Sequence, residues 1–186
     1  MGTNTMTGEE AYAILAGDGS ALDQEAICSA ITRLGKPYDK QQVCRAAPLV
    51  QKFLHHDSHI VRYQAIWFLG SWGKQPEYLS CIIASAQSDA DVDNRAFAAR
   101  AAGTLLRLQR DARAIQALFD MATDEEEAED VRMAAYGSLL YVYYGETARS
   151  QSQNFSPAGN KSVADFDRAW LAFLPQWIEG LPAKTN

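Results

Sequence analysis

The chain has 186 residues, 47% of them hydrophobic, which is enough for one substantial core, and it is too short to suggest two independent domains. Its 17 basic and 23 acidic side chains give a formal net charge of −6, whereas nucleic-acid-binding proteins usually carry a basic surface. The composition therefore argues against general binding of polyphosphates and favours a basic partner.

Helix caps and breakers divide the chain into helices. Thr7 with Glu10 forms a capping-box pattern that opens a short helix, and Gly17 ends that helix. Thr123 with Glu126 gives the same capping-box pattern further along the chain. The helices expected from caps and apolar periodicity span residues 7–17, 22–34, 39–55, 58–72, 76–87, 90–108, 111–121 and 124–144, followed by a final helix that Ser162 and Asp165 start.

The expected organisation is a single all-α domain over residues 1–186. Residues 145–162 are polar and without periodicity, and loops of this length in a compact domain are usually functional or disordered. The parts of the domain are an N-terminal cap at 7–17, repeats over about 22–144, the loop 145–162, and a capping helix with a tail at 163–186. The side chains of the capping helix that are expected to seal the end of the core are Phe166, Trp170, Phe173 and Leu174.

An internal sequence repeat groups these helices into hairpins. Residues 57–70 hold an aspartate, an arginine, an alanine and a Leu-Gly pair at spacings that recur in the chain. Arg62 is followed at the same repeat position by Arg95, 33 residues later (95 − 62), and by Arg132, 37 residues later still (132 − 95). A period of this size is typical of stacked helical hairpins, in which each hairpin buries its apolar face against the next. With a fainter earlier copy that ends at Gly35, the sequence predicts about four hairpins.

The pattern Asp-x-x-x-Val-Arg-x-x-Ala-x-x-x-Leu-Gly, which runs from Asp57 to Gly70, resembles the HEAT-like repeats of many short bacterial proteins and of phycobilisome lyases. The resemblance covers about residues 22–144. It implies a right-handed α-α superhelix in which the second helix of each hairpin lines a concave surface, and such surfaces usually bind a protein partner. It also implies hydrogen-bond ladders between neighbouring repeats, formed by the arginines at the shared repeat position: Arg62, Arg95 and Arg132.

Negative charge is concentrated in residues 89–130. This stretch holds 11 acidic and 5 basic residues, so its net charge of −6 (5 − 11) equals that of the whole chain. Acids are favoured in the first turns of helices, and this preference alone would explain the clustering. The alternative is a surface for a basic protein, which nearby tyrosines would anchor. The residues predicted for that surface are Asp89, Asp91, Glu125, Glu126, Glu127, Glu129, Tyr141 and Tyr144.

One cluster has possible metal-ligand chemistry, formed by His55, His56 and His59 with Asp57. Imidazoles with a carboxylate can hold zinc or iron, but histidines at a helix end also satisfy terminal carbonyl groups. The sequence contains no His-Glu dipeptide of the kind that metal-binding HEAT-repeat hydroxylases use in pairs. We favour the capping role and predict neither a metal nor a cofactor.

The three cysteines, Cys28, Cys44 and Cys81, lie among apolar helical positions without CxxC spacing. This pattern predicts buried, reduced thiols in a cytosolic protein. The first residues carry no secretory signal pattern, and no apolar run reaches membrane-spanning length. A cytoplasmic protein without a membrane partner is therefore expected.

Clustered aromatic side chains suggest either a base-stacking platform or ordinary core and interface. The acidic balance favours core and protein interface over nucleic acid. The aromatics concerned are Tyr63, Trp67, Phe68, Trp72, Tyr78, Tyr136, Tyr141, Tyr143 and Tyr144.

No catalytic triad order or phosphate-binding loop appears in the sequence, so a non-enzymatic protein-binding module is the predicted function. By analogy with HEAT-like immunity proteins, its most specific form is an immunity or inhibitor protein that clamps a basic bacterial toxin acting in the cytosol. One alternative is a scaffold or adaptor subunit of a larger assembly. Another is a HEAT-like enzyme, either a bilin lyase or an alkylpurine DNA glycosylase. A glycosylase needs a basic groove, and the predicted second helices offer Lys40, Arg45 and Lys52 in one repeat but Glu77 in the next.

Overall fold

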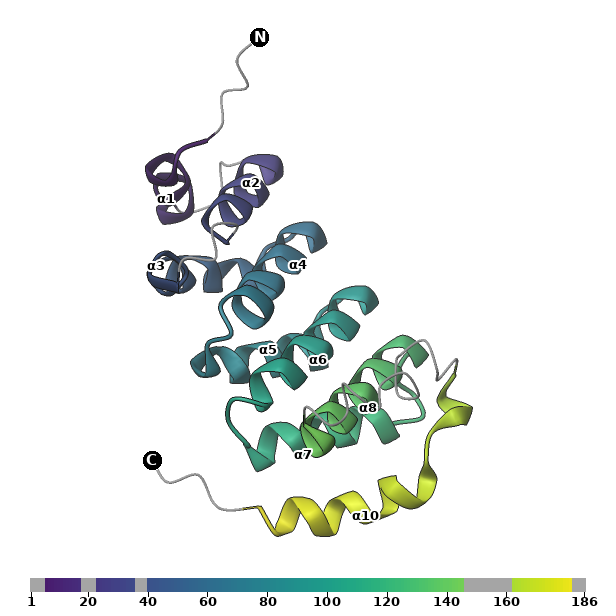
Figure 1. Cartoon of the computed structure of the whole chain (residues 1–186). Helices are drawn as coiled ribbons and strands as arrows, with labels where there is room; N and C mark the ends of the chain where they lie inside the picture. The colour runs from purple at the N-terminus through teal and green to yellow at the C-terminus, as the bar shows by residue number, and fades with distance from the viewer. Residues whose placement is uncertain (1–5, 18–22, 36–39, 146–161, 182–186) are drawn as a thin grey trace. The chain divides into compact units, whose positions relative to one another are not determined.

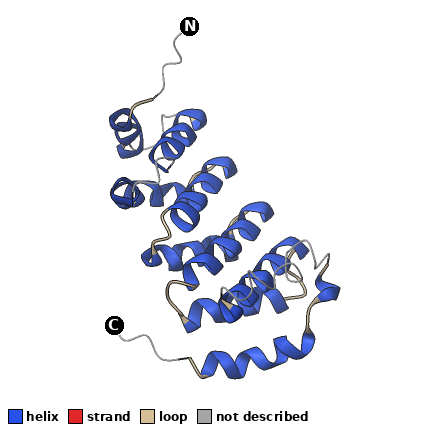
Figure 2. Ribbon diagram, viewed as in Figure 1, coloured by secondary structure: helices blue, strands red, loops and turns tan. Residues whose placement is uncertain are grey.

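The computed structural model describes residues 6–17, 23–35, 40–145 and 162–181, and within these ranges all regular secondary structure is helical (Figures 1 and 2). The predicted loop 145–162 falls almost entirely outside the described residues, as does the tail after residue 181. The chain forms two compact units, Met1–Gln75 and Pro76–Asn186.

The described residues of the first unit form four α-helices, of which α2 and α4 pack side by side while α1 packs on α2 and contacts α3 (Figure 1). The capping box predicted at Thr7 and Glu10 is confirmed, because the Thr7 side chain accepts from the Glu10 backbone N–H and Glu10 accepts from that of Thr7. The described helices of this unit are α1 (Gly8–Ala16), α2 (Gln24–Gly35), α3 (Lys40–Gln51), the 3₁₀ turn η1 (Lys52–His55), α4 (His59–Trp67) and the π-helical turn η2 (Phe68–Trp72).

The helix predicted over 58–72 changes from α to π geometry at Phe68. The backbone N–H of Gly73 donates to the carbonyl of Phe68 at 2.7 Å, which is the wide hydrogen bond of a π turn. This turn carries Trp72 onto Gly35 at the end of α2, where a Cβ atom would lie 1.8 Å from the indole ring. The glycine of the faint first repeat is therefore needed for helix packing.

The second unit contains α6 and α8 packed side by side, with α5 against α6, α7 against α8 and α10 against α7 (Figure 1). Asp91 and Asp111 cap α6 and α7 by accepting hydrogen bonds from backbone N–H groups three residues on. The described helices of this unit are the 3₁₀ turn η3 (Pro76–Tyr78), α5 (Leu79–Ser88), α6 (Val92–Leu106), α7 (Ala112–Thr123), α8 (Glu129–Tyr144), the 3₁₀ turn η4 (Val163–Asp165) and α10 (Arg168–Glu179).

Small residues bring α6 and α8 close together. Ala98, Ala99 and Ala102 of α6 are fully buried. A Cβ atom on Gly103 would lie 2.7 Å from the Cβ of Ser138 in α8, and the Ser138 hydroxyl donates to the Ala99 carbonyl at 2.9 Å. At this point of contact the two helices lie too close for a side chain larger than that of glycine at residue 103.

Two predicted helix starts were wrong. Thr123 with Glu126 does not cap a helix, because Thr123 is the last residue of α7 and its hydroxyl donates to the Phe119 carbonyl. The carboxylate of Asp124 accepts from the Glu126 backbone N–H and holds a turn, and α8 begins only at Glu129. Ser162 and Asp165 do form a capping box, but around the short turn η4.

The C-terminal helix α10 starts at Arg168 under the cap of Asp167 and covers the end of the second unit. Phe166 stacks on Tyr136 with ring centroids 4.0 Å apart, and Trp170 meets the same tyrosine edge-on at 5.5 Å. Burial raises the pKa of the Tyr136 hydroxyl, which accepts a hydrogen bond from the Asp167 N–H. The predicted sealing of the core is confirmed for Phe166, Trp170 and Leu174, whereas Phe173 is 42% exposed.

Candidate protein-binding surface

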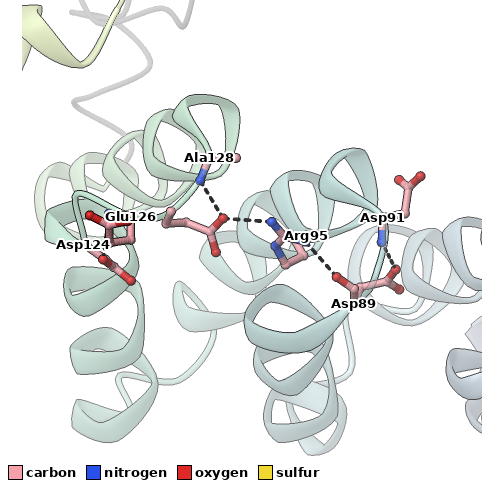
Figure 3. A network of polar contacts seen from close by, with 7 residues as sticks. Asp89, Asp91, Arg95, Asp124, Glu126 and Ala128 are labelled. Carbon is pink, nitrogen blue, oxygen red and sulfur yellow. Dashed lines mark hydrogen bonds and ion pairs between the residues drawn. The ribbon is translucent and has the colours of Figure 1, made fainter.

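Asp89 and Asp91, the first predicted surface acids, lie in the turn between α5 and α6 (Figure 3). Asp89 is only 9% exposed, and its carboxylate accepts from the Asp91 N–H at 2.9 Å and from the Asn94 amide at 3.4 Å. Asp91 caps α6 by accepting from the Asn94 backbone N–H at 3.0 Å. Both carboxylates therefore stabilise the start of a helix. This is the alternative to a binding surface as the explanation for acids at these positions.

Arg95 and Glu127 form an ion pair that links α6 to the turn before α8 (Figure 3). The Arg95 Nη2 donates to Glu127 Oε1 at 2.9 Å, and the two side chains are 18% and 15% exposed. The same Glu127 oxygen also accepts from the Ala128 backbone N–H at 2.7 Å. Since this carboxylate already has charged and backbone partners in a half-buried position, it is poorly placed to meet another protein.

The remaining predicted acids lie between α7 and the start of α8. Glu129 accepts from the backbone N–H of Val163 at 3.1 Å and so holds the η4 turn against α8. Glu125 and Glu126 are exposed, as is Asp124, whose carboxylate accepts from the Glu126 N–H at 3.0 Å. Of the acids predicted for the surface, Glu125, Glu126 and Glu129 are exposed, and Glu129 is engaged by the backbone of Val163.

The predicted anchors Tyr141 and Tyr144 are half-buried near the end of α8. The Tyr141 hydroxyl accepts from Arg107 Nη1 at 2.6 Å, and the guanidinium carbon lies 4.7 Å from the ring centroid. Tyr144 meets Tyr143 edge-on at 4.8 Å and stacks on Trp170 at 6.3 Å. Both rings therefore contribute to the packing of the second unit.

The repeat arginines share a local contact that the repeat pattern alone does not predict. Arg62 Nη1 donates to the carbonyls of His56 and Asp57, each at 2.9 Å, and Arg95 Nη1 donates to the carbonyl of Asp89 at 2.9 Å. Arg132 Nε donates to the carbonyl of Ala122 at 3.4 Å. Each arginine thus satisfies a carbonyl group at or just after the end of the preceding helix. In two of these contacts the carbonyl belongs to the residue six positions before the arginine: His56 for Arg62 and Asp89 for Arg95. This spacing is the sequence feature that could have predicted the contact.

The histidine cluster lies at the end of η1 and the start of α4. His56 Nδ1 accepts from the Ser58 backbone N–H at 3.0 Å, while His55 and His59 are exposed. Among the residues that the structure describes, no group of three or more His, Cys, Asp or Glu side chains is arranged to hold a metal ion. His56 therefore serves the turn before α4, and its ring also meets that of Phe53 at 6.2 Å.

The cysteines differ from one another in exposure. Cys28 and Cys81 are half-buried, and burial raises the pKa of both thiols. The expectation of burial was wrong for Cys44, which is exposed on α3 and accepts a hydrogen bond from the Gln75 amide at 3.0 Å. All three are free thiols.

No helix within the described part of the chain is both long enough and apolar enough to span a bilayer. A family model described as HEAT repeats matches residues 9–102, beginning within α1 and ending within α6. The match confirms the predicted helical-repeat fold, and it starts earlier than the predicted first repeat at residue 22. No curated protein matches the chain.

Proposed function

The chain belongs to the HEAT-repeat family, and from that premise we propose that it is a non-enzymatic module that binds a basic protein. HEAT repeats typically form helical modules that bind other proteins. A basic partner is proposed because the turn after α7 is acidic and exposed: Asp124, Glu125 and Glu126 all face solvent there. Exposed charge of one sign accelerates the encounter with a partner of the opposite sign.

Within this class we propose an immunity or inhibitor protein that neutralises a basic toxin in the bacterial cytoplasm. The exposed acids favour a basic target, and folded helices offer a preorganised surface for it. A scaffold or adaptor subunit needs the same kind of surface, and the two functions differ only in what the partner does on its own.

The alternative of a DNA glycosylase finds little support in the basic residues proposed for its groove. Arg45 lies over the ring of Tyr12 with 4.4 Å between the guanidinium carbon and the ring centroid. Lys52 donates to the carbonyl of Gly17 and lies over the ring of Phe53 at 5.0 Å. Both cations therefore already contact groups of this chain, and a phosphate backbone would have to compete with those contacts.

The test is an affinity purification of the tagged chain from its native host, with identification of stoichiometric partners by mass spectrometry. We expect a basic protein that is toxic when expressed alone and harmless when expressed with this chain. A harmless basic subunit would support a scaffold in place of an inhibitor. Recovery of no protein partner would contradict the binding function itself.

A further inference from the structure

A groove lies between α5 and α7, and one of its ends reaches the turn before α8. Its first part is a hollow of about 530 Å³, lined by α5, by the N-terminal half of α7 and by the residues just before each helix. Leu79 and Ile83 of α5 face Ala114 and Ala117 of α7 there, and the small alanine side chains leave the space open. Polar residues line its outer end, among them Glu77, Asp111 and Arg113.

The groove continues along the same helix faces into a second hollow of about 460 Å³. Gln87 of α5 borders both hollows, so they are neighbours along the helix pair. The second hollow is lined by Asp120, Met121 and Thr123 of α7 and by Asp124 and Glu127 of the following turn.

The chemistry changes along the groove from apolar to acidic. Leu79 and Ile83 at one end and Met121 at the other form a buried floor. Asp120 and Asp124 form an exposed rim at the C-terminal end of α7, where the helix dipole adds negative potential. Asp120 accepts from Gln116 Nε2 at 2.8 Å, and because a carboxylate has about four acceptor positions, capacity for a cationic donor remains.

We propose that this groove docks an amphipathic segment of the basic partner, an inference that rests on the function proposed above. Apolar side chains of the segment lie over Ile83 and Ala117, and its lysine or arginine side chains reach Asp120 and Asp124. Charge complementarity selects this occupant, because the acidic rim repels phosphate groups and would also repel the same rim on a second copy of the chain.

The test uses the full-length chain and a synthetic probe, a short peptide with leucine and lysine at helical spacing, with a leucine–glutamate peptide as the charge-reversed comparison. Two groove variants are compared with one control variant, whose charge change equals that of the first groove variant. Asp120→Lys with Asp124→Lys reverses the rim, and Ala117→Phe fills the groove without altering charge. Glu125→Lys with Glu126→Lys changes the same number of charges on the exposed turn, outside the groove lining.

We expect the lysine peptide to bind and the glutamate peptide not to bind. Both groove variants should weaken binding about tenfold or more, through faster dissociation, whereas the control should weaken it by only a few-fold, through slower association. Circular dichroism and thermal unfolding of each variant report whether its helices are retained. A variant that loses its helices is replaced by the milder Asp120→Asn with Asp124→Asn or by Ala117→Leu.

The inference is overturned if the control loses as much affinity as the rim reversal, or if Ala117→Phe binds the peptide like the parent chain. It is also overturned if sedimentation reveals a dimer that Ala117→Phe disrupts, because the occupant is then a second copy. A native partner that still binds both groove variants refutes the groove and leaves the binding function intact. Absence of any native partner refutes the function, whatever the peptide does.

Discussion

Adjacent glutamates in the turn before α8 have different physical roles. Glu126 projects into solvent, whereas Glu127 is half-buried, pairs with Arg95 and accepts from the Ala128 N–H. The sequence presents both as members of one acidic run. It could not separate them, because their roles depend on a turn that the carboxylate of Asp124 holds in place.

Replacing Glu127 by glutamine should therefore destabilise the protein. The variant keeps the side-chain shape but removes the charge that pairs with Arg95, whose Nε is already buried without a hydrogen-bond partner. We expect a loss of about 1–2 kcal/mol in the free energy of unfolding, measured by urea denaturation. Glu126→Gln is the matched control and should change stability by less than about 0.5 kcal/mol. Equal effects would mean that the ion pair contributes no net stability.

At the scale of helices, the sequence predicted the existence of the helices better than their boundaries. Breakers and apolar periodicity predicted separate helices where the structure has α2 to α7. The start of α8 and the π turn at Phe68 were missed. Both accompany contacts that apolar periodicity does not reveal: the turn held by Asp124 and the Arg95–Glu127 ion pair at the first, and the packing of Trp72 on Gly35 at the second.

Gly103→Ala tests whether the repeat glycine serves helix packing. The new Cβ atom would meet Ser138 at 2.7 Å, so α6 and α8 must separate, and we expect a loss of about 1–3 kcal/mol in unfolding free energy. Gly137→Ala provides a control within α8, because nothing lies within 4 Å of the Cβ added there. That variant should gain about 0.5–1 kcal/mol from the better helix propensity of alanine.

Opposite signs for the two alanine variants would assign the effect to packing, since both change a glycine inside a helix. A stabilising Gly103→Ala would instead mean that α6 and α8 can separate at little cost. Denaturant midpoints with unchanged slopes are the required measurement, because a changed slope would indicate an altered unfolded or native ensemble.

At the scale of the whole molecule, a helical repeat stack must end in an element that covers its last apolar face. In the second unit α10 does this through Trp170, which is 8% exposed and contacts the rings of Tyr136, Tyr143 and Tyr144. The sequence predicted this sealing from aromatic content alone. It did not distinguish Trp170 from Phe173, because the orientation of α10 is set by its start at Asp167.

Trp170→Ala should consequently remove much of the stability of the second unit, by about 3–5 kcal/mol, since it opens a cavity beneath α10. Phe173→Ala, on the same helix but 42% exposed, should lose less than about 1 kcal/mol. Far-UV circular dichroism during urea unfolding is the suitable readout, because removing Trp170 also removes a fluorophore. Because each helix of a repeat protein is stabilised mainly by its neighbours, Trp170→Ala should destabilise α10 and the helices next to it most strongly. We therefore expect an early unfolding step in the Trp170 variant alone. If both variants unfold like the parent chain, α10 does not seal the core.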